Sequence, residues 1–592
     1  MDRKSIIIIV VSVLVMMGWF RLADYLNPPK PLPTNSPARA TSPALTNRAT
    51  ALATNNALAT SELRPSPRAL VVPNVPEQVL SIENNIARYT FTSHGGGLKI
   101  VELKDFPGRV ACGSAGVETT NNFAALNAYA PVPVMVLLGE EAVQGDGVFT
   151  LTKTGTGVLA EKTLTNGLRF VKEFQLGSNF VIHSSVRLEN TTAQTLVVPP
   201  HELVIGTATP IGTNDPPASL GLFSYDGNSA PHIMSAWFAN SGFMCMPGSP
   251  RSEYQSQGTN VVWAAVHNQF FTMVVMPGEP VLKAVARPVE LDFPQAQPAK
   301  AANSSGYQTA FVYPSVSLAP HQVLERQFQI FAGPKEYKTL ARLGNNQDLV
   351  MNFGQYFGFF AKALLLSMNG LHHLLHLGYG WTIILITVII KLVFWPLTQA
   401  STRSMKRMAA LQPQMNAIRE KYKDDAQKMN TKLMEFMREN KVSPVGGCLP
   451  MLIQIPFFIG FYTMLQGAIE LRGASFLWAC DLSQPDTLFI IPGLNLPFNL
   501  LPLIMGATQL WQAQMTPPSP GMDPVQQKIM KYMPLMFLFI LYNFSAGLAL
   551  YWTVQNLLSI VQMKLTKNIE QKSSAVVPTP GTKLNWSAKK KK

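Results

Sequence analysis

Residues 381–400 read WTIILITVIIKLVFWPLTQA, and this stretch decides the class of fold. It is mostly apolar and has a single charged residue, and it is as long as the roughly 20 residues that a helix needs to cross a bilayer. Comparable apolar runs occupy residues 5–20, 449–468, 496–514, 529–544 and 548–565. The sequence therefore predicts a polytopic α-helical membrane protein with six transmembrane helices.

The composition agrees with a membrane protein. Of the 592 residues, 47% are hydrophobic and only 14% are charged, which is too apolar for a soluble or a disordered chain. Four cysteines cannot form a disulfide scaffold, and no paired Cys and His spacing indicates a metal site. There is no Walker A motif either. We therefore expect no cofactor, no metal and no enzyme activity.

The positive charge indicates the topology. The net charge of +14 is concentrated in residues 401–445 and 564–592, next to apolar runs. Basic segments beside transmembrane helices stay in the cytoplasm. Six crossings that start with a cytoplasmic N-terminus place both basic segments in the cytoplasm, so the C-terminus is predicted to be cytoplasmic too.

The chain divides into six predicted parts. We expect an N-terminal transmembrane anchor over residues 1–26 and a flexible linker rich in Pro, Ala and Thr over 27–70. Short alternating runs over 71–345 predict a large extracytoplasmic all-β sandwich. The sequence leaves open whether Cys112 and Cys245 of this domain form a disulfide. An interfacial amphipathic helix (346–380), a five-helix membrane core (381–570) and a basic cytoplasmic tail (571–592) follow.

Residues 401–445 predict a cytoplasmic helical hairpin. Met, Leu and Phe recur at helical spacing in two stretches that Lys423, Asp424 and Asp425 separate. Its basic residues either form a solvated face or contact an acidic partner such as ribosomal RNA or anionic lipid. The candidate contacts are Arg403, Lys406, Arg407, Arg419 and Lys421.

Lys391 is the candidate functional residue of the membrane core. A cation in the middle of a spanning helix costs about 3 kcal/mol, and such a residue usually faces a bundle interior or a hydrated cavity. None of the six apolar runs contains an acidic residue. Thr387 lies one helical turn before Lys391, and polar residues of neighbouring spans accompany it, among them Gln454, Thr463 and Asn556. They predict a hydrated, positively charged groove within the membrane.

Several segments resemble motifs of the Oxa/Alb/YidC family of membrane protein insertases. The resemblance is continuous over about 200 residues, and the anchor and β domain match the architecture of the long form found in Gram-negative-type inner membranes. The segments are KLVFWPLT at 391–398, LQP at 411–413, VSPVGGCLP at 442–450 with Gln454 and Pro456, DPVQQKIM at 523–530 and GLALYW at 547–552.

The resemblance implies an insertase and chaperone of the bacterial inner membrane that inserts nascent membrane proteins, alone or with the Sec translocon. It also implies contacts with the phospholipid bilayer and the ribosome, the latter through Lys589, Lys590, Lys591 and Lys592. Lys391 occupies the position of the family's groove cation, where Arg is usual, so the charge is kept but the bidentate guanidinium is lost. Thr387, Tyr551 and Trp552 match groove positions. Leu452, Ile455 and Phe458 are the expected slide for the substrate's apolar segment.

Two other functions use the same features. A transporter or channel for a polar solute would need the groove, but the spans show no internal repeat and no carboxylate for ion coupling. A membrane-anchored envelope scaffold would need only the β domain. For such an anchor, Lys391 would be a costly residue without a purpose.

Overall fold

The computed structural model describes residues 70–71, 73–113, 116–119, 122–211, 217–240, 248–257, 260–293, 305–354, 357–440, 449–493, 496–516, 532 and 535–573. The predicted anchor, nearly all of the predicted linker and the end of the basic tail lie outside these ranges, as does Cys245. The side chain of Cys112 is also outside the described part, whereas Cys480 is disulfide-bonded. The chain forms two compact units, a β unit and a helical unit.

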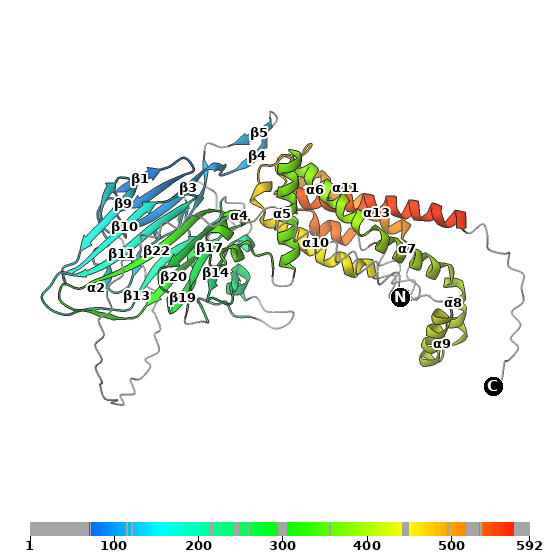
Figure 1. Cartoon of the computed structure of the whole chain (residues 1–592), viewed down its shortest axis with the longest axis horizontal. Helices are drawn as coiled ribbons and strands as arrows, with labels where there is room; N and C mark the ends of the chain where they lie inside the picture. Colours follow the sequence, from blue (N-terminus) through cyan, green and yellow to red (C-terminus); the bar gives the residue numbers. More distant parts are fainter. Residues whose placement is uncertain are drawn as a thin grey trace, which may run out of the picture. The chain divides into compact units, whose positions relative to one another are not determined.

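The β unit is built from antiparallel sheets (Figure 1). The largest sheet has nine strands in the order β15 (His232–Met234), β14 (Gly221–Tyr225), β17 (Trp263–His267), β18 (Phe271–Pro277), β22 (Val323–Pro334), β11 (Val181–Asn190), β10 (Leu168–Leu176), β9 (Gly157–Thr163) and β8 (Thr150–Thr154). A five-stranded sheet has the order β16 (Tyr254–Gln255), β19 (Lys283–Glu290), β20 (Ser305–Tyr313), β13 (His201–Ala208) and β7 (Leu137–Leu138).

A four-stranded sheet comprises β1 (Val79–Glu83), β2 (Ala87–Thr92), β3 (Gly97–Pro107) and β6 (Phe123–Leu126). Smaller elements complete the unit: the pairs β4 (Val110–Gly113) with β5 (Gly116–Thr119) and β12 (Leu196–Val198) with β21 (Val316–Leu318), and the helices α2 (Glu141–Gln144), α3 (Ser235–Ala239), α4 (Tyr337–Arg342), η1 (Pro217–Ser219) and η2 (Gln347–Met351).

One hydrophobic core joins these sheets. Phe91 of β2 and Phe174 of β10 are both fully buried, and their ring centroids are 4.9 Å apart. Strands β13, β14 and β17 are buried along their whole length, as expected for strands that are covered on both faces. The unit is therefore a layered β-sandwich, as the alternating runs predict.

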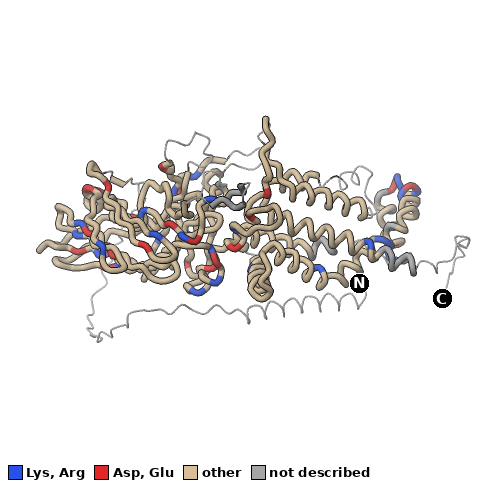
Figure 2. The backbone as a smooth tube through the Cα atoms, turned by 90° about the horizontal axis from the view of Figure 1, so that it is seen from above, with Lys and Arg blue, Asp and Glu red and all other residues tan. Residues whose placement is uncertain are grey.

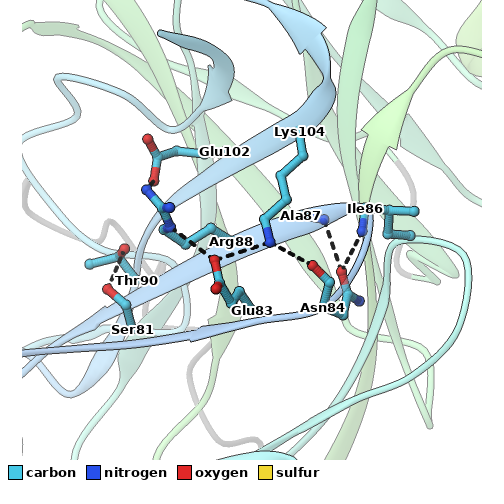
Figure 3. A network of polar contacts seen from close by, with 9 residues as sticks. All are labelled: Ser81, Glu83, Asn84, Ile86, Ala87, Arg88, Thr90, Glu102 and Lys104. Carbon is cyan, nitrogen blue, oxygen red and sulfur yellow. Dashed lines mark hydrogen bonds and ion pairs between the residues drawn. The ribbon is translucent and has the colours of Figure 1, made fainter. Parts of the chain in front are cut away.

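Polar contacts fix the β1–β2–β3 edge (Figure 3). Glu83 accepts from Arg88 and from Lys104, and Arg88 also pairs with Glu102. Lys104 Nζ donates to Asn84 O at the turn. This charge-balanced network forms one side of a cavity of about 580 Å³. Because these side chains are partly exposed, their ion pairs add little stability and mainly fix the shape of the hairpin.

The helical unit consists of long helices, a pair of short helices and a small β-hairpin (Figure 1). Its elements are α5 (Gly358–Leu375), α6 (Tyr379–Val393), α7 (Trp395–Ala410), α8 (Gln412–Lys421), α9 (Ala426–Glu439), α10 (Leu449–Gly467), β23 (Thr487–Ile491), β24 (Leu496–Asn499), α11 (Leu500–Met515) and α13 (Ala546–Ser573). Residues 535–541 are also helical, and the 3-10 helix η4 (Ile469–Leu471) follows α10.

Two predicted spans contain a break or a strand in the structure. The run 381–400 is not one helix, because α6 ends at Val393 and α7 begins at Trp395. Pro396 has no N–H for the carbonyl of Leu392, and its ring clashes there, so the helix breaks. Lys391 therefore lies in the last turn of α6 rather than at mid-helix. The run 496–514 starts with strand β24, and helix α11 begins only at Leu500.

Length and hydropathy mark one candidate span in the described part of the chain. No individual helix there is both long and apolar enough to cross a bilayer. The helices α5 and α6 together are long and apolar enough to cross a bilayer, and they are bent by 116° at the break between them. His376 occupies the left-handed region at this break, with φ of 51°.

Helices α8 and α9 contact each other and are joined at residues 422–425. Met415 of α8 and Leu433 of α9 are buried. Asp425 caps α9 by accepting from Lys428 N at 2.9 Å, which satisfies one free N–H of the first turn. Figure 2 shows charged residues along α8 and α9, whereas the longer helices of this unit carry few.

Candidate functional site

Lys391 is buried, with 7% of its surface exposed, and its side chain contacts a neighbouring helix. Its Nζ donates to Ser559 Oγ of α13 at 2.8 Å. No carboxylate in the described part of the chain forms an ion pair with it. The cation therefore lies at an interhelical position whose hydrogen-bond partner is neutral.

Two further side chains of α13 reach neighbouring helices. Asn556 Nδ2 lies 3.4 Å from Met505 O and 3.3 Å from Thr508 Oγ1, both on α11. Gln562 Nε2 donates to Thr398 Oγ1 at 2.6 Å and to Trp395 O at 3.3 Å on α7. Asn556, Ser559 and Gln562 follow one another at intervals of three residues, so they lie along one face of α13. We call these three residues the α13 polar seam.

The predicted groove threonines donate within their own helices. Thr387 Oγ1 donates to Ile383 O of its own helix at 2.6 Å, and its side chain is buried. Thr463 Oγ1 donates to Ile459 O of its own helix at 2.9 Å. Both hydroxyls are thus satisfied within their own helices, as is common for Ser and Thr in apolar helices.

Aromatic rings connect α10 with α13. Tyr551 stacks on Phe461 with ring centroids 4.1 Å apart. Trp552 meets Phe458 edge to face at 4.7 Å. The structure therefore brings the predicted groove residues Tyr551 and Trp552 together with Phe458, which belongs to the predicted slide.

The other residues expected near the substrate path lie on the outer face of α10 or beyond the described side chains. Gln454 is exposed, and 38% of Ile455 is exposed. The side chain of Leu452 lies outside the described part. Gln454 is thus on the surface of the unit, and no contact of its side chain with Lys391 is described.

A second aromatic cluster lies at the break between α6 and α7. Phe394 follows Lys391 by three residues, and its ring centroid is 5.0 Å from that of Phe457 on α10. Phe457 also packs against Phe360 of α5 at 5.1 Å. This cluster fixes the α6–α7 break against α5 and α10.

The turn before α13 is attached to a loop of the same unit. Ala546 N donates to Gln484 O at 2.7 Å, and Gly547 N donates to Leu482 O at 2.9 Å. A Cβ at residue 547 would lie 3.1 Å from Leu482 O. Glycine therefore permits this close approach.

The basic candidates of the hairpin are distributed over two helices. Arg403 and Arg407 are exposed on α7, and Lys421 is exposed at the end of α8. Lys406 and Arg419 are partly buried. The tail lysines 589–592 lie outside the described residues.

Neither Ser559 nor Gln562 stands out in the sequence as a functional residue. Each is an isolated polar residue in an apolar helix, and polar residues there are most often structural. The available signal is their spacing of three residues with Asn556, which places all three on one face. The three helices that these residues contact, α11, α6 and α7, could not be identified from the spacing.

Comparison with known proteins agrees with this architecture. Residues 370–573 match the family model of the 60Kd inner membrane protein, and residues 79–366 match that of the YidC periplasmic domain. The membrane protein insertase YidC of Oleidesulfovibrio alaskensis is 32% identical over 584 residues, covering 95% of this chain and 98% of that protein. This chain belongs to the YidC family of membrane protein insertases.

Two further similar proteins are also called YidC insertases. The membrane protein insertase YidC of Geobacter sulfurreducens is 45% identical over 261 residues, which cover 44% of this chain and 46% of that protein. A crystal structure of an active YidC insertase matches 84% of this chain and 94% of its own, with 17% identity and a TM-score of 0.32. The β-sandwich is thus the periplasmic domain of a YidC family chain, and the family is one of inner membrane proteins.

Proposed function

We propose that this YidC family chain inserts nascent integral membrane proteins into the inner membrane and helps them to fold, alone or together with the Sec translocon. The observation that carries this proposal is the buried Lys391, whose hydrogen-bond partner is the neutral hydroxyl of Ser559. A cation without a carboxylate partner inside an apolar bundle attracts acidic groups strongly, because the local dielectric constant is low.

The mechanism follows from two forces. An acidic or polar N-terminal segment of the substrate first approaches Lys391, drawn by its charge. The apolar segment of the substrate then moves along α10 into lipid, driven by transfer of apolar surface out of water. Leu452, Ile455 and Phe458 form the proposed slide, while Thr387, Gln454, Thr463, Asn556, Tyr551 and Trp552 line the proposed groove with Lys391. The process needs no cofactor and no covalent step.

The proposed topology has six membrane crossings with both termini in the cytoplasm. The anchor is residues 1–26, followed by the linker 27–70, the periplasmic sandwich 71–345 and the interfacial helix 346–380. The core 381–570 then carries five crossings and the cytoplasmic hairpin 401–445, and the tail 571–592 ends in the cytoplasm. The bend of 116° between α5 and α6 supports a helix along the surface that leads into a crossing.

The proposed cytoplasmic partner is the ribosome. Arg403, Lys406, Arg407, Arg419 and Lys421 on the hairpin, with Lys589, Lys590, Lys591 and Lys592 on the tail, supply positive charge for ribosomal RNA. Contact with the ribosome would place the emerging nascent chain close to the groove.

Substitution of Lys391 tests the proposal. We expect Lys391→Glu to reduce the insertion of a substrate with an acidic N-terminal tail by about tenfold or more, because like charges repel in a low-dielectric site. Lys391→Arg keeps the charge and should retain insertion. The measurement is protease protection of the translocated tail in proteoliposomes that contain the full chain.

The control is the same substrate with a neutral tail, which should insert equally well with all three proteins. Equal insertion of the acidic-tail substrate by the wild type and both variants would remove Lys391 from the mechanism. A photoreactive residue at Ile455 gives an independent test, since a slide on α10 requires a transient crosslink to the substrate's apolar segment.

A further inference from the structure

The hydroxyl of Ser559 is oriented by its own helix. Ser559 Oγ lies 2.8 Å from Gln555 O, and a carbonyl oxygen can only accept, so the Ser559 hydroxyl donates its hydrogen there. The lone pairs of Ser559 Oγ remain available on the side away from Gln555. Lys391 Nζ lies 2.8 Å from Ser559 Oγ and donates to it. The acceptor is thus fixed in direction before the cation binds it.

The ammonium group keeps spare hydrogen-bonding capacity. Lys391 Nζ carries three N–H donors, and its hydrogen bond in the described part of the chain is the one to Ser559. Nevertheless, only 7% of the surface of Lys391 is exposed. Two donors and a full positive charge are therefore available in a place where water is scarce.

From this geometry we propose that Ser559 is a positioning residue for the groove cation. Its neutral hydroxyl holds the Lys391 ammonium in one place without cancelling the charge, so that two N–H donors face an incoming carboxylate. The substrate class selected in this way is a segment with Asp or Glu ahead of its apolar span. The inference rests on the proposed function and adds the residue that sets its preference.

The reason for a hydroxyl at this position is physical. A lysine has a flexible four-carbon stem, and without an acceptor its ammonium is free to take many positions. A carboxylate at residue 559 would form a permanent ion pair with Lys391 and would compete with the substrate. Serine avoids both outcomes, since it gives direction but adds no charge.

The test compares two substrates that differ only in charge. One single-span protein carries two Asp residues in its N-terminal tail, and its twin carries two Asn residues there. We expect Ser559→Ala to reduce insertion of the Asp-tail substrate by about tenfold, the effect of one lost hydrogen bond to a charged group. Insertion of the Asn-tail substrate should not change. Ser559→Asp should give a larger loss for the Asp tail alone, and Ser559→Thr should restore the wild-type ratio.

Thr553→Val is the matched control. Thr553 lies on the same helix and is buried, but its hydroxyl donates to Ala549 O at 2.7 Å and makes no contact with the cation. This variant removes a hydroxyl from α13 and should leave the Asp-to-Asn insertion ratio unchanged. Variants are compared at equal protein content in proteoliposomes, so that a loss of folding lowers both substrates together.

The outcomes separate the two levels of the proposal. An unchanged ratio in Ser559→Ala, or an equal loss for both tails, would overturn the positioning role. If Lys391→Asn lowers the ratio in the same experiment although Ser559→Ala does not, the proposed function stands and only the positioning role of Ser559 fails. If Lys391→Asn also leaves the ratio unchanged while both substrates are inserted, the positioning role and the charge-based mechanism fail, and insertion itself stands.

Discussion

Lys391 and Lys172 are both buried, but they are held in different ways. Lys391 donates to a side-chain hydroxyl of another helix. Lys172 of β10 is fully buried in the β unit, donates to Gly95 O at 2.7 Å and lies 4.5 Å from the ring centroid of Phe149. Gly95 and Gly96 have φ of 78° and 56°, so the turn that exposes this carbonyl requires glycine.

Lys172 predicts a pH dependence of stability. Burial, with a smaller repulsion from Lys162, lowers the pKa of Lys172 to about 7, far below the 10.5 of an exposed lysine. Between these values the unfolded chain binds a proton that the folded chain does not, so this group makes the β unit more stable as the pH rises from 7 to 10.5. The slope is at most about 1.4 kcal/mol per pH unit.

In Lys172→Met we expect the β unit to lose the part of this rise that Lys172 contributes, whereas Lys335, whose pKa burial also lowers to about 7, should keep its own part. The measurement is pulse proteolysis of the full chain in urea at pH 7.0, 8.0, 9.0 and 9.5, which gives the free energy of unfolding of the β unit. Lys153→Met, at an exposed position of β8, is the control and should keep the wild-type slope. An identical slope in Lys172→Met and the wild type would show that Lys172 stays protonated when buried.

At the scale of elements, a close helix contact depends on Gly460. A Cβ at residue 460 would lie 2.9 Å from Phe360 Cβ and 3.4 Å from a methyl carbon of Leu364, both on α5. Small residues allow helix backbones to approach closely in apolar surroundings. Phe360 also holds the aromatic ring of Phe457. Gly460 therefore determines how closely α10 packs on α5.

We expect Gly460→Val to destabilise the helical unit by about 1–3 kcal/mol, because the added methyl groups overpack the contact with α5. The measurement is thermal unfolding of the purified full chain in detergent. The same substitution at Gly378, where an added Cβ meets no atom within 4 Å, should have a much smaller effect. Equal melting temperatures for Gly460→Val and the wild type would contradict the close contact.

The sequence predicts the elements better than their contacts. Hydropathy indicates where α10 and α13 lie, and alternation indicates the β-sandwich, because both patterns are local. The break before Trp395 was also visible in principle, since Pro396 cannot continue the helix. The pairing of Lys391 with Ser559 was not, because 168 residues separate them and periodicity says nothing about which helices become neighbours.

At the scale of the whole molecule, charge and apolar surface are segregated along the chain. Carboxylates in the β unit pair with basic residues, as Arg287 does with Glu202 and Glu253. The excess positive charge lies in the hairpin segment and in the tail. An excess of positive charge in these two segments is available for a polyanion.

Replacing Lys589, Lys590, Lys591 and Lys592 by Gln should weaken cosedimentation of the full chain with ribosomes. The expected loss is about threefold to tenfold at low salt, and it should vanish near 0.5 M salt, where charges are screened over a few ångströms. Replacement of the same four residues by Arg should retain binding. If the Gln variant binds as well as the wild type at low salt, the tail does not contribute to ribosome contact.

The contacts of α13 differ from side to side. Towards α11 and α7 it uses the amide groups of Asn556 and Gln562, whereas towards α10 its described contacts are the rings of Tyr551 and Trp552. Lipid tails can replace ring contacts but cannot replace an amide's hydrogen bonds. We therefore expect the bundle to part on the α10 side, where a substrate's apolar helix can take the place of Phe458 and Phe461 and leave sideways, while the other two sides stay closed.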